Sequence, residues 1–153
     1  MPKVDVAAIE EQRGSSGYPA PFRKLVEGRI RKRLGDAGGL TQFGVNLCRL
    51  APGAASSQRH WHDQEDELVY MLEGEAVLVE DGSETVLKPG DVATFKAGVR
   101  NGHHIVNRSD RDALLLEVGT RSLNDHGEYS DIDMKFVMED GVDRYLHKDG
   151  TPY

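Results

Sequence analysis

The feature that most constrains the fold is a series of short strand-like segments, separated by turns that contain glycine or proline. Apolar side chains alternate with polar ones over short stretches, as expected for half-buried strands. The predicted strands are 24–34, 41–50, 67–73, 76–80, 84–87, 92–95, 103–107 and 113–118, with an extended segment at 56–62. We find no long helical pattern between them. The sequence therefore predicts an all-β domain, either a sandwich or a barrel.

Size and charge limit the possible partners of the chain. Its 153 residues suit a single domain, and 26 acidic against 19 basic residues give a formal net charge of −7. This charge disfavours nucleic acid and anionic membranes as partners. We find no apolar run of the length of a signal peptide core or a membrane span, and the single cysteine, Cys48, cannot form an internal disulfide. We expect a cytoplasmic protein that binds neither nucleic acid nor membrane, with Cys48 as a buried thiol in a strand.

Two histidines separated by one residue, His60 and His62, are the first candidate metal ligands. Side chains alternate between the two faces of an extended strand, so these two imidazoles point to the same side. The pair can therefore hold one ion. Trp61, which lies between them, is expected to point away and to act as a packing residue.

The residues around this pair resemble the first motif of the cupins, which are jelly-roll barrels of the double-stranded β-helix type. That motif has a glycine, His-x-His, a glutamate shortly afterwards and a second glycine after six more residues. The matching residues here are Gly53, His60, His62, Glu67 and Gly74, with one extra residue before His60. Asp66 is a rival acid, but only Glu67 keeps the spacing to Gly74. The resemblance implies a jelly-roll barrel in which His60, His62 and Glu67 are metal ligands.

The second cupin motif supplies a further histidine, followed after three residues by an asparagine. In this chain Pro89–Gly90 opens the corresponding stretch, and His103 and Asn107 have the required separation, although the spacing is less regular than in the family. The adjacent His104 is the alternative ligand, and strand alternation points it to the opposite face. We prefer His103 because it shares its face with Ile105 and Asn107.

Three histidines and one glutamate form a mixed nitrogen and oxygen site that suits Zn(II), Fe(II), Mn(II), Ni(II) or Co(II). The alternative is a cupin that has lost its metal, in which the same histidines are hydrogen-bonded core residues. The chain resembles small single-domain bacterial cupins, some of which are named sugar-phosphate or mannose-6-phosphate-type isomerases. This implies a metal-dependent, isomerase-like enzyme acting on a small polar or anionic substrate such as a sugar phosphate. An Fe(II) dioxygenase and a non-enzymatic ligand-binding or regulatory module are the alternatives, and no residue is assigned as catalytic.

We interpret residues 1–153 as a single cupin domain with three parts. Residues 1–39 form an N-terminal arm and edge strand, 40–120 the barrel core, and 121–153 a polar, loop-like tail that packs back on the barrel. Leu68, Tyr70 and Leu72 form an outward apolar face that needs cover, and the resemblance implies a homodimer.

Several polar residues are weaker candidates for a substrate site. The basic cluster at 29–33 could bind phosphate, but such runs more often form a solvated face, which we favour here. Donors that could flank the barrel mouth are Arg49, Gln58, Arg59, Lys96, Arg100 and Asn101. In the tail, His126, Tyr129 and His147 could close the pocket, although a solvated side chain is the commoner outcome.

Overall fold

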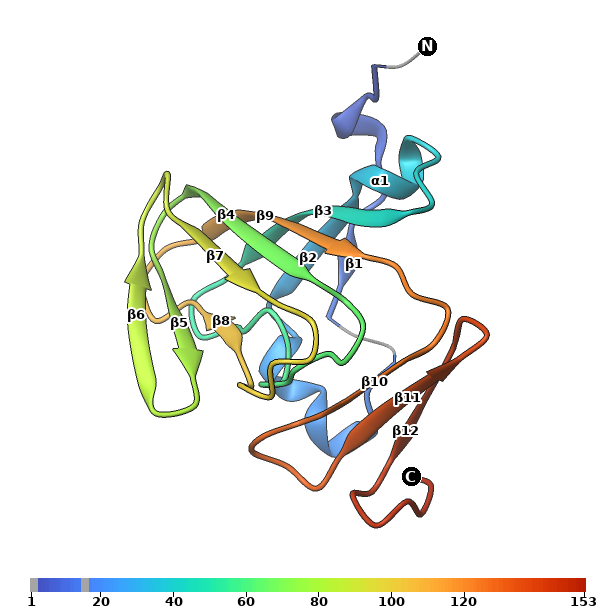
Figure 1. Cartoon of the computed structure of the whole chain (residues 1–153). Coiled ribbons are helices and arrows are strands. Elements are labelled where there is room, and N and C mark those ends of the chain that lie inside the picture. The colour runs from blue at the N-terminus through green and yellow to red at the C-terminus, as the bar shows by residue number, and fades with distance from the viewer. Residues whose placement is uncertain (1–2, 15–16) are drawn as a thin grey trace.

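The structure is a computed structural model that describes residues 3–14 and 17–153. Its largest sheet has six antiparallel strands (Figure 1). The expected arm includes residues 1–2 and 15–16, which lie outside the described residues. In spatial order the strands are β1 (Gln12–Arg13), β2 (Arg29–Arg33), β3 (Phe43–Leu50), β9 (Ala113–Thr120), β4 (Glu67–Glu73) and β7 (Val92–Phe95). Neighbouring strands are antiparallel throughout.

A second sheet of three strands closes the barrel against the first. Its order is β6 (Ser83–Leu87), β5 (Ala76–Glu80) and β8 (His104–Val106). Inward side chains of both sheets form one core, whose fully buried members include Met71, Ile105 and Leu115. Cys48 belongs to this core, and burial raises the pKa of its thiol, so the prediction of a buried cysteine in a strand is confirmed. The all-β prediction is confirmed as well.

Gly74, the last residue of the first motif, shows why that position takes glycine. It has a φ of 76°, in the left-handed region that side chains disfavour. A Cβ there would also lie 2.6 Å from the carbonyl oxygen of Asp112. The backbone therefore needs glycine where the chain leaves β4.

The N-terminal part differs from the predicted strand 24–34. The chain forms the short 3-10 helices η1 (Val6–Ala8), η2 (Ala20–Phe22) and η3 (Lys24–Val26), and only then enters β2. The strand prediction was wrong for residues 24–28, because Val26 turns into a second hydrophobic cluster instead of a sheet. The predicted loop at 35–39 contains most of a short helix, α1 (Leu34–Ala37).

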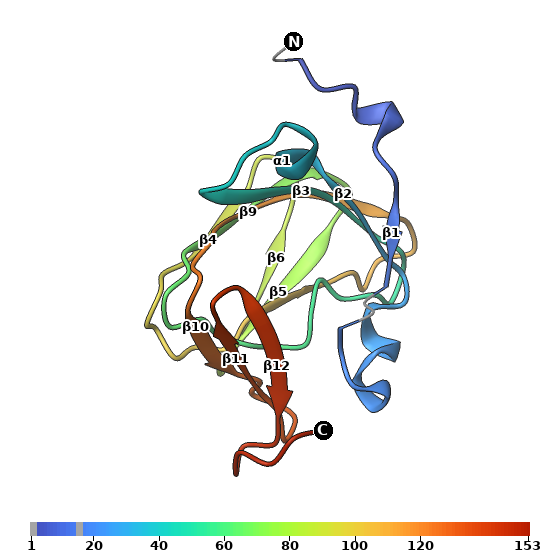
Figure 2. The same ribbon diagram turned by 90° about the vertical axis from the view of Figure 1, so that its right-hand side faces the viewer.

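The prediction of a loop-like tail was also wrong. Residues 121–153 contain a third antiparallel sheet made of β10 (Asp125–Glu128), β11 (Lys135–Glu139) and β12 (Val142–Leu146). Met134, Phe136 and Tyr129 from this part of the chain pack on Tyr18 and Val26 of the N-terminal part. The tail sheet lies below the barrel, at the same end as η2 and η3 (Figure 2). Its polar sequence reflects strands that bury only one side.

The segment 56–62 joins the barrel to the tail sheet. Instead of a full strand it makes single β-bridges, from His60 to His103 on one side and to Tyr129 on the other. The backbone N–H of Trp61 donates to Glu128 and that of Asp63 to His126. The two motif histidines therefore sit where barrel and tail meet. Among the described residues, no helix has the length and apolar character needed to cross a membrane.

Candidate metal centre and cavity

The imidazoles of His60 and His62 face each other through their Nε2 atoms, which are 3.0 Å apart. The Nδ1 atom of His60 donates to the carbonyl oxygen of Gln58 at 2.9 Å, and that of His62 donates to the carboxylate of Asp125 at 2.6 Å. Each Nδ1 therefore carries a proton, and in the neutral rings both Nε2 atoms present a lone pair. Two lone pairs at this distance repel each other unless a proton or a metal ion lies between them.

Glu67 completes the cluster. Its carboxylate is 3.8 Å from Nε2 of His62 and 2.7 Å from Nε2 of His103. One ligand atom each from His60, His62 and Glu67 lies within 4.8 Å of the others. Burial acts to raise the pKa of Glu67, but the hydrogen bond with His103 and the neighbouring imidazoles outweigh it and hold the pKa at about 2. Burial lowers the pKa of His60 to about 3, so this ring is neutral. The cluster thus offers an ionised carboxylate and a neutral imidazole.

This geometry fits a divalent metal ion. Two nitrogen ligands at about 2.1 Å from one ion are separated by roughly 3.0 to 3.4 Å, depending on the coordination angle. The 3.0 Å between the Nε2 atoms of His60 and His62 agrees with that separation. The donor set of imidazole and carboxylate accepts any of the first-row divalent metals named above.

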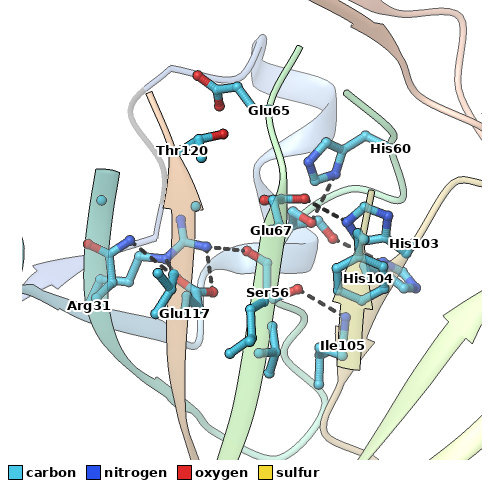
Figure 3. A pocket seen from close by; sticks show the side chains of 18 of the residues that line it. Arg31, Ser56, His60, Glu65, Glu67, His103, His104, Ile105, Glu117 and Thr120 are labelled. Atoms are coloured by element: carbon cyan, nitrogen blue, oxygen red, sulfur yellow. Dashed lines mark hydrogen bonds and ion pairs between the residues drawn. The ribbon is translucent and has the colours of Figure 1, made fainter. Parts of the chain in front are cut away.

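His103 and His104 occupy different environments. The His103 ring stacks on Phe95 at 3.5 Å between centroids and makes the hydrogen bond with Glu67. His104 instead directs Nδ1 to the carbonyl oxygen of Ser57 at 3.0 Å. The structure therefore brings His103, and not His104, into contact with the cluster (Figure 3). That His103 binds a metal stays a prediction.

Asp125 is a residue that the sequence did not point to. Its side chain is fully buried, and one oxygen accepts from the backbone N–H groups of Asp63 and Gln64 while the other accepts from His62. Such a carboxylate fixes the orientation of a metal-binding imidazole and increases its basicity. Glu65 lies nearby, 3.8 Å from Nδ1 of His62. Asp125 is 63 residues from His62 in a polar tail, so only the folded chain shows the pair.

Replacing Asp125 by asparagine is expected to lower the affinity for a divalent metal by about tenfold to a hundredfold, because the amide supports His62 less well than a carboxylate. Competition with a chromophoric chelator measures this change. Asp63→Asn is the matched control, since Asp63 contacts His126 and Gln64 but not His62. Equal affinities in wild type and Asp125→Asn would show that the His62–Asp125 contact does not serve metal binding.

A cavity of about 430 Å³ opens beside the cluster, and we term it the main cavity. Its lining includes His60, Glu67 and His103 together with Arg29, Arg31 and Glu117. Arg29 is 6% exposed and Arg31 is half-buried, so the solvated face that we favoured for this basic cluster is wrong for both residues. They alternate with Ile30 along β2 and so point to the same side, into the barrel.

The other candidate donors contribute less. Lys96 and Asn101 line a smaller cavity of about 180 Å³ next to His62 and Glu67. The remaining four contact protein groups: Arg49 pairs with Asp112, Gln58 donates to Phe22, Arg59 pairs with Asp81 and Asp131, and Arg100 lies over the ring of Trp61. The main cavity is instead lined by the arginines of β2 and by Arg121.

The three tail candidates have separate environments. Tyr129 is buried with its ring 5.6 Å from that of His60, and burial raises the pKa of its hydroxyl. His126 lies near Asp63 and Trp61, and His147 pairs with Asp133 and stacks on Tyr153. None of the three lines the main cavity. Trp61 is buried, as a packing residue should be.

Comparisons with known proteins agree with this architecture. The family described as the cupin domain matches residues 46–119. A Silicibacter pomeroyi structure, described as a sugar phosphate isomerase from a cupin superfamily, is 49% identical over 99% of this chain and 96% of that chain, with a TM-score of 0.95. An Acidithiobacillus ferrooxidans structure with the provisional name sugar phosphate isomerase is 28% identical over 85% of this chain and 84% of that chain, with a TM-score of 0.76.

A curated relative carries a different name. A Mycobacterium tuberculosis protein named beta-D-galactosidase is 34% identical over 99 residues, which are 65% of this chain and 81% of that protein. The fold, the motif residues and these similarities together show that the chain belongs to the cupin family.

Proposed function

We propose that this chain is a divalent-metal-dependent isomerase of a small anionic sugar such as a sugar phosphate. The observation that carries the proposal is the pair of opposed imidazole Nε2 atoms beside Glu67, at the wall of a cavity large enough for a small molecule. The 49% identity to a protein described as a sugar phosphate isomerase supports the choice of substrate.

His60, His62, Glu67 and His103 would hold the metal ion, and Asp125 would orient His62. A bound divalent metal supplies Lewis acidity toward a carbonyl or hydroxyl oxygen of the substrate. The protein has three tasks of its own: it keeps the imidazoles in the tautomer with Nδ1 protonated, it encloses the substrate, and it moves a proton between adjacent carbons.

Asp143 is the candidate for the proton transfer. This residue of β12 lines the main cavity, and its carboxylate makes no hydrogen bond with any described residue. Partial desolvation at the cavity wall raises the pKa of Asp143, which makes its carboxylate a stronger base than an ordinary aspartate. Unlike Glu67 and Glu117, it pairs with no cationic or imidazole group among the residues that the structure describes.

Asp143→Asn is therefore expected to lower kcat by about a hundredfold to a thousandfold while metal content stays at the wild-type level. Steady-state kinetics and elemental analysis of the same samples test this. Asp140→Asn, on the turn between β11 and β12, is a control for charge removal from the hairpin. A kcat within threefold of wild type would remove Asp143 from the mechanism.

The activity itself is tested with metal-loaded protein and a panel of aldose and ketose phosphates, with interconversion followed by NMR. We expect turnover of at least one pair and loss of that turnover after metal removal. An aryl galactoside belongs in the panel because of the galactosidase relative. Hydrolysis of this compound, or oxygen consumption by iron-loaded protein, without isomerisation would refute the proposal.

We also propose that the chain pairs as a homodimer through the outer face of the large sheet. Tyr70 and Leu72 of β4 are exposed there, as are Phe43 of β3 and Val92 of β7. An apolar face of this kind on a barrel strand favours association. Sedimentation at micromolar concentration is expected to show a species of about twice the chain mass of 16.9 kDa, and a monomer alone would refute pairing.

A further inference from the structure

Two arginines and one glutamate lie together in the lining of the cavity. Arg29 and Arg31 point inward from β2, and Glu117 points inward from β9. The three form what we term the arginine cluster, with two positive charges and one negative charge. Gly119 of β9 pairs with Glu67, and Glu117 is the next residue of β9 on the same face of the sheet. The arginine cluster is therefore deeper along the strands than the histidine cluster.

Arg31 has capacity left for a ligand. Its Nε and Nη2 atoms bind the two carboxylate oxygens of Glu117, each at 2.7 Å, and Nη2 also donates to the carbonyl oxygen of Ser56 at 3.1 Å. Its Nη1 donates to no acceptor among the described residues, and 26% of the side chain is exposed. One face of this guanidinium is thus open to the cavity.

Arg29 forms no ion pair within the described part of the chain. It donates to the carbonyl oxygens of Ser56 and Gly14, and its buried Nε atom has no hydrogen-bond partner among the described residues. Carbonyl groups bring no net negative charge, and Glu117 is already engaged with Arg31. An unpaired buried charge is costly unless a counterion accompanies it. Burial and the adjacent Arg31 accordingly lower the pKa of Arg29.

We propose that the arginine cluster is an anion subsite that binds the oxyanion of the substrate, a phosphate or a carboxylate. Figure 3 shows Arg31 and Glu117 on one side of the pocket and His60 and His103 on the other. Guanidinium groups are the preferred donors to such oxyanions, and the oxyanion supplies the missing negative charge. A substrate bound in this way presents its other end to the histidine cluster. That last step rests on the proposed function, whereas oxyanion binding does not.

The test uses metal-free protein, so that oxyanion binding is measured without catalysis. Inorganic phosphate, and acetate in a parallel titration, are added while calorimetry records heat and 15N NMR records the Nε–H signals of the arginines. We expect saturable binding of at least one anion, with the largest shifts at Arg29 and Arg31. Tighter binding of phosphate would indicate a phosphate ester as substrate, and tighter binding of acetate a sugar acid.

Two isosteric substitutions of opposite sign place the anion. Glu117→Gln removes a negative charge beside Arg31, and Asn46→Asp adds one at the residue that pairs with Glu117 across the sheet. We expect affinity for the anion to rise about tenfold in the first variant and to fall about tenfold in the second, because one charge changes at close range. Circular dichroism verifies folding, and if Glu117→Gln does not fold, Asn46→Asp alone decides.

The absence of saturable binding in wild-type protein, or equal affinities in wild type and both variants, would overturn the subsite. These results are separable from the fate of the enzyme proposal. Phosphate binding without turnover of any sugar phosphate would keep the anion subsite and refute the isomerase. Turnover of a sugar phosphate, with no anion binding at Arg29 and Arg31, would keep the isomerase and refute the anion subsite.

Discussion

His62→Ala is expected to lower the affinity for divalent metal by at least about a hundredfold, more than the loss of a supporting hydrogen bond would cost. The substitution removes one of the two opposed Nε2 atoms and leaves Asp125 without its imidazole partner. Metal content after purification without a histidine tag, and competition with a chelator, give the measurement. Circular dichroism checks that the barrel is intact.

The matched control is His104→Ala, which removes a half-buried histidine whose ring bonds to the carbonyl oxygen of Ser57 and not to the metal cluster. We expect its metal affinity to stay within about threefold of wild type, and that of His103→Ala to fall. If His104→Ala lost metal while His103→Ala kept it, the assignment of the histidine from the second motif would have to be reversed. If His62→Ala and His103→Ala both kept wild-type metal affinity, the metal centre would be refuted.

Gly127→Ala is expected to lower the free energy of unfolding by about 3 kcal/mol. A Cβ at this position would overlap the carbonyl oxygen of Trp61 and lie 2.5 Å from Cε1 of Phe136. Neither the Trp61 backbone nor the packed Phe136 ring can shift easily, so β10 has to move away from the histidine segment. For a chain of this length we expect a fall in Tm of roughly 6 to 12 °C, measured by calorimetry.

Gly44→Ala is the control, because the nearest contact of a Cβ there would be the flexible side chain of Arg121, at an ordinary 3.5 Å. Its Tm is expected to stay close to wild type. Gly127→Ala is expected to lower metal affinity as well, since the displaced strand carries Asp125. A Gly127→Ala protein with wild-type Tm and metal affinity would show that the contact between tail and histidine segment is looser than the structure has it.

The features that the sequence could predict are those encoded within short stretches. The strands from 67 to 118 follow from alternation and turn residues, and most lie within two residues of the predicted bounds. Spacing alone selected Glu67 over Asp66, and strand parity selected His103 over His104 for contact with the cluster. In the structure Glu67 bonds to His103, while the carboxylate of Asp66 accepts from the backbone N–H of Ala97.

The features that it could not predict depend on contacts between distant segments. Asp125 has its role only because β10 docks on residues 60–63, and no local pattern in the tail encodes that approach. The arginines of β2 look like a solvated run because Lys32 and Arg33 share it. The burial of Arg31 follows from Glu117, a residue 86 positions later that becomes its partner.

Because the tail docks on the histidine segment, the stability of residues 121–153 contributes to the free energy of ligand binding at the candidate metal centre. Asp125 reaches His62 only while the third sheet is seated, so occupancy of the centre and seating of the tail are thermodynamically linked. A fused domain or a proteolytic cut that loosens residues 121–153 is therefore expected to weaken ligand binding at His62. In turn, an occupied centre holds the C-terminus in place.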